Sequence, residues 1–138
     1  MAEQKTKGIR GPQGRLTSTS FEGNIATDVV DYRQSRDVNL SGLQATGNGD
    51  FIGIQILFPA STTPHTIQLP QPFPNVVEVR YFRQTADGQR TSFTSKSGTL
   101  FLTSYEADKQ YAVGGFDFVA DVDGTERLFN GEFDIRLV

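Results

Sequence analysis

The 138-residue chain contains no cysteine and no tryptophan, and it has a single histidine. Without cysteine it can form no disulfide, and it offers neither a thiol nucleophile nor a thiolate metal ligand. The one histidine, His65, stands beside Pro64 among hydroxyl side chains in "TTPHTIQ". A lone loop histidine is typically solvated, and it cannot complete a zinc site of the usual composition. We therefore expect no metal, no cofactor and no histidine-dependent catalysis.

Long apolar runs are also missing from the sequence. No segment approaches the ~18–20 apolar residues that a membrane span requires. The N-terminus "MAEQKTKGIRGPQGRL" has basic residues without the apolar run of a secretory signal. These features predict no membrane partner. They make a soluble cytoplasmic protein the default, unless a leader has been removed; the compartment itself stays unknown, because many exported bacterial proteins lack cysteine too.

Charge is distributed unevenly along the chain. Residues 1–15 carry a net charge of +3, which leaves −6 for the remainder. Because this segment is also rich in glycine, we predict a flexible basic N-terminal arm over residues 1–15. An acidic body would repel phosphates, and the arm lacks interleaved aromatic side chains. Both features argue against nucleic acid as the partner.

What the chain does have is fourteen glycines and eleven phenylalanines, a composition that suits strands and turns better than helices. Alternating segments are separated by short polar turns, and no segment is a convincing amphipathic helix. Residues 16–138 are therefore predicted to form a single antiparallel β-sandwich of about 8–9 strands, with an up-and-down β-barrel as the alternative. Residues 16–37 stay open between strands and a helical turn.

Several hairpins can be placed along the chain. Residues 38–58 are predicted to turn at Asn48-Gly49, because a two-residue turn needs positive φ and both residues tolerate it. Further hairpins turn at residues 86–88 and 106–109. Between the first hairpin and the turn at residues 86–88, prolines leave at most "HTIQL", residues 65–69, as an edge strand.

The stretch "VADVDGTERL", residues 119–128, resembles a calcium-binding loop. An EF-hand loop needs an acidic or amide ligand at its first position, glycine at its sixth and glutamate at its twelfth. Placing Gly124 at the sixth position puts Val119 first and Asn130 twelfth. Starting at Asp121 instead puts Glu126 where glycine is required. We therefore predict a two-residue turn at Asp123-Gly124.

That turn fixes the register of the C-terminal hairpin. Phe118 then faces Phe129, and Phe116 faces Gly131, where we predict a bulge. A one-residue slip would expose several rings, each worth roughly 1.5–3 kcal/mol when buried. The large apolar side chains that share the inner face are Phe116, Phe118, Ala120, Val122, Phe129, Phe133, Ile135 and Leu137.

The opposite face of this hairpin is acidic and supplies the enzymatic alternative. Its carboxylates include Asp117, Asp121, Glu132 and Asp134. Retaining glycosidases need two carboxyl groups about 5–5.5 Å apart, which neighbouring positions on a sheet can supply. Acid-rich outer faces are also the normal condition of soluble sheets, and nothing in the sequence separates the pKa values of these groups.

Aromatic side chains supply the candidates for ligand binding. Exposed aromatics on a sandwich can stack on sugar faces, and a barrel interior can hold an apolar ligand. The candidates are Tyr81, Phe82, Tyr105 and Tyr111.

The C-terminal third carries a structural pattern of glycines and inward aromatics. It reads Gly98-Thr99-Leu100, then Gly115-Phe116-Asp117-Phe118, then Asn130-Gly131-Glu132-Phe133-Asp134. Over about forty residues it resembles small uncharacterised domains of bacterial exported and surface proteins. The resemblance implies an all-β fold and no assigned activity. Such proteins usually carry an export signal.

The sequence leads to three hypotheses of function. The first is a non-enzymatic binding or interaction module for a carbohydrate or a protein, with homo-oligomerisation at an exposed edge strand. The second is a carboxylate-dependent glycoside hydrolase. The third is a lipocalin-like carrier of a small apolar ligand.

Overall fold

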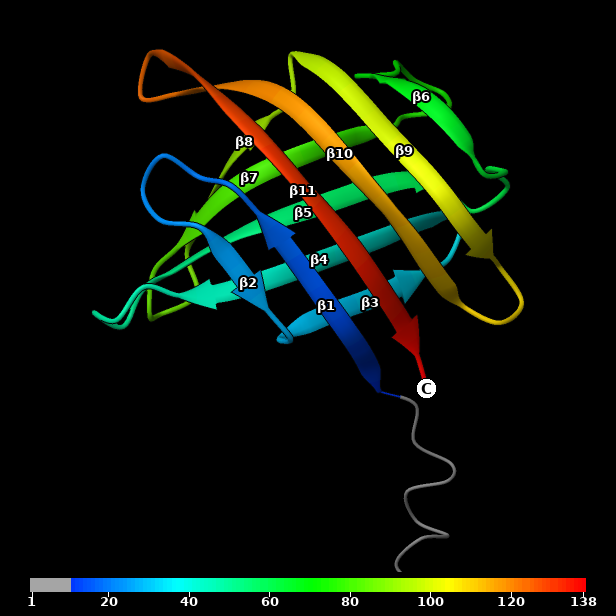
Figure 1. Ribbon diagram of the computed structural model, residues 1–138, viewed down its shortest axis with the longest axis horizontal. Coiled ribbons are helices and arrows are strands. Elements are labelled where there is room, and N and C mark those ends of the chain that lie inside the picture. The colour runs from blue at the N-terminus through cyan, green and yellow to red at the C-terminus, as the bar shows by residue number, and fades with distance from the viewer. Residues whose placement is uncertain (1–10) are drawn as a thin grey trace, which may run out of the picture.

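The computed structural model describes residues 11–138 as two antiparallel β-sheets packed face to face (Figure 1). The strands of the sheet at the front of the view cross those of the sheet behind it. This arrangement confirms the predicted all-β sandwich. The barrel alternative is wrong, because the strands form two separate sheets instead of one closed sheet.

The larger sheet has six strands in the order β2-β1-β11-β10-β9-β6. Its strands are β1 (Pro12–Ser18), β2 (Ile25–Thr27), β6 (His65–Leu69), β9 (Ser97–Glu106), β10 (Tyr111–Val122) and β11 (Thr125–Leu137). The smaller sheet has five strands in the order β3-β4-β5-β7-β8. Its strands are β3 (Val30–Gln34), β4 (Asp37–Ala45), β5 (Phe51–Pro59), β7 (Glu78–Gln84) and β8 (Arg90–Thr94). The predicted edge strand "HTIQL" is β6, at one edge of the larger sheet.

The described part of the chain forms eleven strands, more than the predicted 8–9. The difference arises near the N-terminus, where short strands replace the region left open between strand and helical turn. β2 and β3 have three and five residues, which is too short for a period to stand out in the sequence. They are held by pairing with β1 and β4.

Strand β1 starts inside the segment predicted as a flexible arm. Pro12 pairs with Leu137 of β11, so residues 12–15 belong to the sheet and the predicted boundary at residue 16 is too late. Proline is tolerated at the first position of a strand, where its missing N–H is not needed. The rest of the predicted arm, residues 1–10, lies outside the described residues.

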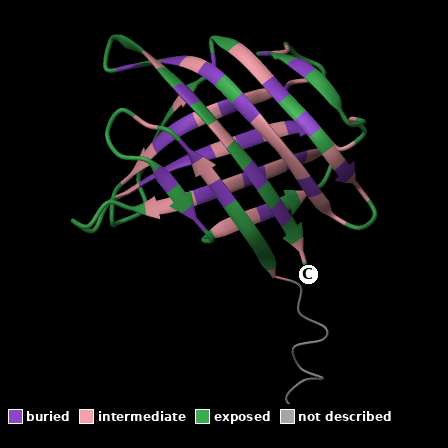
Figure 2. Cartoon of the chain, in the orientation of Figure 1, coloured by how far each residue is buried: buried purple, intermediate pink, exposed green. Residues whose placement is uncertain are grey.

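The register of the β10–β11 hairpin is the predicted one. Phe118 faces Phe129 and Val122 faces Thr125. Asp123 and Gly124 have φ values of 55° and 82°, the left-handed pair that a two-residue hairpin turn requires. The rings point inward and the carboxylates outward, and Figure 2 shows the resulting alternation of buried and exposed residues along these strands.

The bulge predicted at Gly131 is wrong. Phe116 faces Gly131 in an unbroken register, and the irregularity lies between β10 and β9, at Val113 and Gly114. A Cβ atom on Gly131 would lie 2.0 Å from the backbone oxygen of Thr17 and 2.7 Å from the Phe116 ring. Glycine is therefore needed here because β1 and a cross-strand ring approach the backbone closely.

The turn between β4 and β5 also differs from the prediction. It is a three-residue loop at Gly47–Gly49, closed by a 3.0 Å hydrogen bond from the Thr46 N–H to the Asp50 carbonyl. Both glycines of the loop have positive φ. A two-residue turn would place Leu40 opposite Leu57, on the solvent side. The observed register instead pairs Leu40 with Ile56, and both are buried, so core packing decides the loop length.

The core lies between the inner faces of the two sheets and is rich in aromatic rings. The Phe118 and Phe129 rings of the larger sheet stack with centroids 4.8 Å apart. The Tyr81 ring of the smaller sheet stacks on Phe129 at 4.6 Å. These contacts join the two layers near one end of the sandwich.

Replacing Phe118 with alanine should lower the free energy of unfolding by about 3–5 kcal/mol, because the cavity would open in the ring stack. Leu128→Ala is the matched control on the same hairpin, since Leu128 is 75% exposed, and it should change stability by less than about 0.5 kcal/mol. Urea unfolding of both variants measures the difference. Equal losses would contradict the observed register.

Candidate functional site

Of the four predicted aromatic site residues, three are buried, namely Tyr81, Phe82 and Tyr105. Tyr105 packs edge-on against Phe58 at 5.1 Å and donates a 2.8 Å hydrogen bond to the Ala60 carbonyl. Tyr111 is half-buried, and its hydroxyl lies 3.0 Å from the Glu106 carboxylate. Tyr81 belongs to the core stack. These side chains do not form an exposed aromatic platform.

Phe82 is fully buried although it lies on the outer face of the smaller sheet. Its ring covers Gly53 of β5, where a Cβ atom would lie 2.2 Å from the ring. The guanidinium carbon of Arg90 lies 3.8 Å from the ring centroid on this face. A glycine beneath and an arginine above explain how a phenylalanine outside the core is shielded from water.

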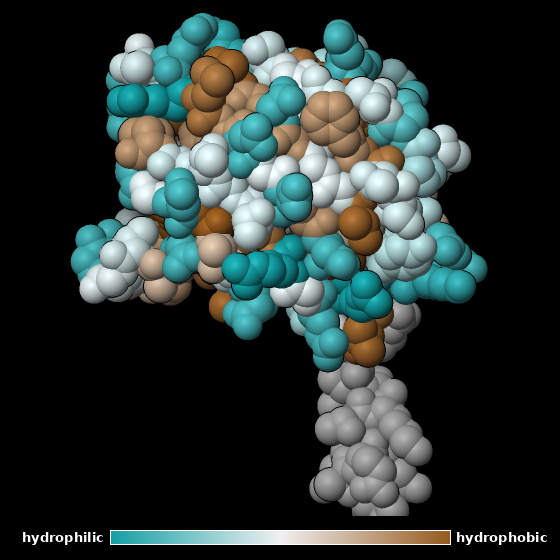
Figure 3. Space-filling view, in the orientation of Figure 1, coloured by the Kyte–Doolittle hydropathy of each residue, from teal (hydrophilic) through white to brown (hydrophobic). Residues whose placement is uncertain are grey.

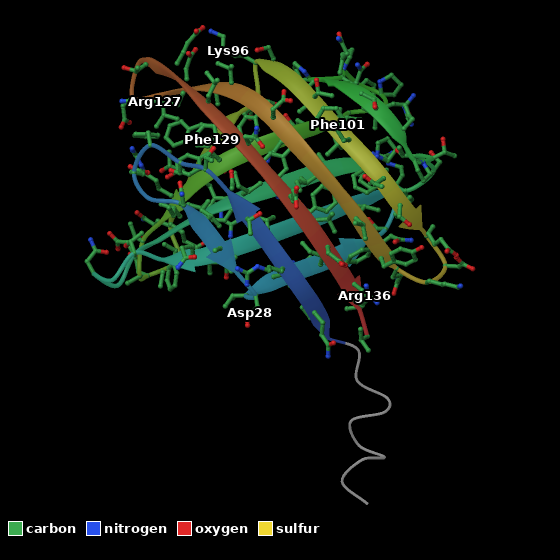
Figure 4. All side chains as sticks on the ribbon, viewed as in Figure 1. Asp28, Lys96, Phe101, Arg127, Phe129 and Arg136 are labelled. Carbon is green, nitrogen blue, oxygen red and sulfur yellow. The ribbon has the colours of Figure 1, made fainter. Side chains whose placement is uncertain are left out.

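The four predicted acidic residues are exposed on the outer face of the larger sheet, which mixes hydrophilic and hydrophobic side chains in Figure 3. Asp121 pairs with Lys96 at 3.3 Å, and Asp134 pairs with Arg136 at 3.2 Å. Figure 4 shows Lys96 and Arg136 towards opposite ends of the sheet. The carboxylates are therefore spread along the hairpin and solvated, as is usual for the outer face of a sheet.

A groove of about 450 Å³ lies at the end of the sandwich where the β4–β5 and β7–β8 loops meet. A Cβ atom on Gly49 would lie 3.8 Å from the Ala86 side chain, so the tips of these two loops are in contact range. The half-buried ring of Phe51 and the side chain of Ile52 form the apolar part of the lining. Its hydrogen-bonding part includes Asn48, Asp50, Gln84, Thr85, Gln89 and Thr91.

Charged side chains fix one wall of this groove. Glu22, in the β1–β2 loop, accepts hydrogen bonds from Arg83 Nε at 2.9 Å and from Arg83 Nη2 at 3.0 Å. The Tyr81 hydroxyl donates a further hydrogen bond to the same carboxylate. Arg83 Nη1 in turn pairs with Asp123 at 2.9 Å. This network, which we call the Glu22–Arg83 network, joins a loop and a hairpin of the larger sheet to β7 of the smaller one.

The Glu22–Arg83 network also determines the protonation states of Glu22 and Tyr81. The Arg83 hydrogen bonds hold the pKa of Glu22 below its ordinary value, against the opposing effect of burial. Burial, assisted by the hydrogen bond to Glu22, raises the pKa of the Tyr81 hydroxyl. At neutral pH Glu22 is therefore a carboxylate and Tyr81 a neutral donor.

Sequence reasoning did not find this groove. The available signal was the chemistry of two loops, "TGNGD" and "TADGQ", which are rich in side chains that form hydrogen bonds. Their contact follows from the pairing of β5 with β7, which brings both hairpin tips to one end of the sheet. Glu22 and Arg83 are 61 positions apart, and no local pattern links them.

The chain was also compared with known proteins. No family model, curated protein or solved structure matches it. The resemblance of the C-terminal third to domains of bacterial exported and surface proteins stays a prediction. Within residues 11–138, no three His, Asp or Glu side chains gather as a set of metal ligands, and no helix has the length and apolar character needed to cross a membrane.

Removing the charge of Glu22 should lower the free energy of unfolding by an amount that depends on pH. Because the pKa of Glu22 is lower in the folded protein, its contribution to stability is present above its ordinary value of 4.5 and is lost as the pH falls through the folded-state pKa. Glu22→Gln should therefore lose about 1 kcal/mol at neutral pH, a value reduced by the partial exposure of the pair. The difference from wild type should shrink as the pH falls below 4.5 and through the folded-state pKa of Glu22.

Urea unfolding at several pH values measures this effect. Glu126→Gln is the matched control, since Glu126 forms an exposed ion pair with Lys96 and should change stability little at any pH. A Glu22→Gln variant as stable as wild type at neutral pH would contradict the assigned network.

Proposed function

We propose that the protein is a non-enzymatic binding module whose ligand, a carbohydrate, occupies the groove between the β4–β5 and β7–β8 loops. The observation that carries this proposal is the combination of an accessible aromatic ring, Phe51, with amide, carboxylate and hydroxyl side chains around one groove. A sugar ring presents an apolar C–H face, which packs on an aromatic ring, and a rim of hydroxyl groups, which needs planar hydrogen-bonding partners.

The size and stiffness of the groove support the proposal. About 450 Å³ lies within the range of roughly 300–1,000 Å³ that is common for small-molecule sites. The Glu22–Arg83 network and the short glycine turns hold the walls before a ligand arrives. Side chains that are already ordered lose less conformational freedom on binding, so more of the contact energy appears as affinity.

The competing hypotheses receive less support. A carboxylate-dependent hydrolase needs a cleft that withdraws one acid from water, whereas Glu132 and Asp134 are exposed. The lipocalin-like carrier needs a closed barrel, whereas the strands of residues 11–138 form two separate sheets. Homo-oligomerisation through the edge strand β6 also stays a proposal. It receives less support because Pro64 and Pro70 flank β6, and prolines at a sheet edge oppose pairing with a strand of another chain.

Titration with monosaccharides and short oligosaccharides, followed by 15N NMR, tests the binding function. At least one sugar should shift the backbone signals of Asn48 and Gln89 saturably. Phe51→Ala should weaken that binding about tenfold or more, because the stacking surface is lost. Phe101→Ala is the matched control, since Phe101 is also partly exposed but lies on β9 of the other sheet.

A second variant, Gln89→Ala, tests the groove independently in case Phe51→Ala does not fold. Gln89 is an exposed loop residue, so its replacement should not disturb the fold. Weaker binding in both variants supports the groove. Binding that both variants leave unchanged would contradict it. Glycoside turnover that disappears in Glu132→Gln would replace the binding function with the hydrolase.

A further inference from the structure

The outer face of the smaller sheet contains a second hollow, separate from the groove. Its volume is about 190 Å³, and its lining comes from four of the five strands of that sheet. The lining residues are Asp31, Arg33, Asn39, Ser41, Gln55 and Arg90.

Two arginines reach this hollow, and each is anchored through its Nε atom. Arg90 Nε donates a 2.9 Å hydrogen bond to the Gln84 side chain, while its guanidinium group stacks on Phe82. Arg33 Nε donates to the Asp31 carboxylate at 2.8 Å. Anchoring through Nε orients the planar group and leaves the two terminal nitrogens as a fork of donors.

The charge of Arg90 is poorly compensated. No carboxylate of the described chain lies within ion-pairing distance of it, whereas Arg33, the other arginine of the hollow, has such a partner in Asp31. Burial and then the nearby charge of Arg33 lower the pKa of Arg90, and Asp31 only partly offsets them. The lining carries two guanidinium groups against the one carboxylate of Asp31, which leaves one positive charge over and favours an anion beside Arg90.

Neutral donors complete the lining. Gln55 Nε2 donates a 2.9 Å hydrogen bond to Asn39 Oδ1, which leaves the amide nitrogen of Asn39 as a donor. Ser41 adds a hydroxyl group. In the strand register Ser41 lies opposite Asp31 on β3 and opposite Gln55 on β5. The hollow thus combines two guanidinium groups, an amide and a hydroxyl with the carboxylate of Asp31, which Arg33 already pairs. Forked guanidinium donors match the paired oxygens of a carboxylate, sulfate or phosphate group.

We propose that this hollow on the outer face of the smaller sheet is an oxyanion-binding site, in which Arg33 and Arg90 hold the anion from two sides. The volume suits one tetrahedral or planar oxyanion. The ligand is either a free inorganic ion or the charged group of a larger molecule such as an acidic saccharide. None of its lining residues belongs to the carbohydrate groove. The two sites share only Gln84, which lines the groove and accepts the hydrogen bond from Arg90 Nε.

NMR of the arginine Nε–H signals tests the proposal with sodium sulfate and sodium phosphate as probes. At constant ionic strength, with sodium chloride as the reference salt, both probes should shift the Arg33 and Arg90 signals saturably. Arg90→Gln should weaken the binding about tenfold or more. Arg136→Gln is the matched control, since Arg136 is an exposed arginine on the other sheet.

Arg33→Gln provides a second variant that should leave folding intact, because the Arg33 side chain is 79% exposed. It should also weaken sulfate binding. Shifts that follow ionic strength alone, or that survive both substitutions, would overturn the proposal.

Glucose 6-sulfate and glucose distinguish the two sources of the anion. Tighter binding of the sulfated sugar than of sulfate, with no response of Arg90 to glucose, identifies the charged group of a larger ligand. Equal affinity for sulfate and the sulfated sugar identifies a free ion. Arg33→Gln changes a residue that lines this hollow and not the groove, and it should leave the sugar-induced shifts of Asn48 and Gln89 unchanged, so a failure here is separable from a failure of the groove.

Discussion

The packing of aromatic rings between the two sheets is the interaction on which the rest of this structure depends. Phe118 and Phe129 face each other across the β10–β11 hairpin, and Tyr81 reaches them from the opposite sheet. Shifting the hairpin by one residue would turn its rings to water and its carboxylates to the core. The same register determines the outer surface, because the residues before and after each inward ring on a strand point to the outer face of the sheet.

The candidate sites follow from this packing. The Tyr81 hydroxyl extends from the aromatic stack to Glu22, which holds Arg83 at the wall of the groove. Phe82, the next residue on β7, points to the other side of the sheet and supports Arg90 over the second hollow. Adjacent residues of one strand therefore serve two surfaces, because successive side chains of a strand point to opposite faces.

Much of the fold was accessible from the sequence, and most of the candidate site was not. Alternation placed the inward rings of the C-terminal hairpin, and Asp123-Gly124 fixed its register. The same turn chemistry misled at Asn48-Gly49, where the burial of Leu40 against Ile56 determined a longer loop. The groove escaped prediction because its walls come from loops far apart in the chain. Phe82 was a candidate ligand contact, but it is buried beneath Arg90.

Ring-to-ring nuclear Overhauser effects across the sandwich test the central claim most directly. With phenylalanine and tyrosine selectively labelled in the intact chain, the Phe129 ring should show contacts to both Phe118 and Tyr81, since the corresponding centroids lie 4.8 Å and 4.6 Å apart. The backbone of Phe118 should pair with that of Phe129. Contacts displaced by one residue along β11, or a Phe129 ring without a contact to Tyr81, would contradict the account.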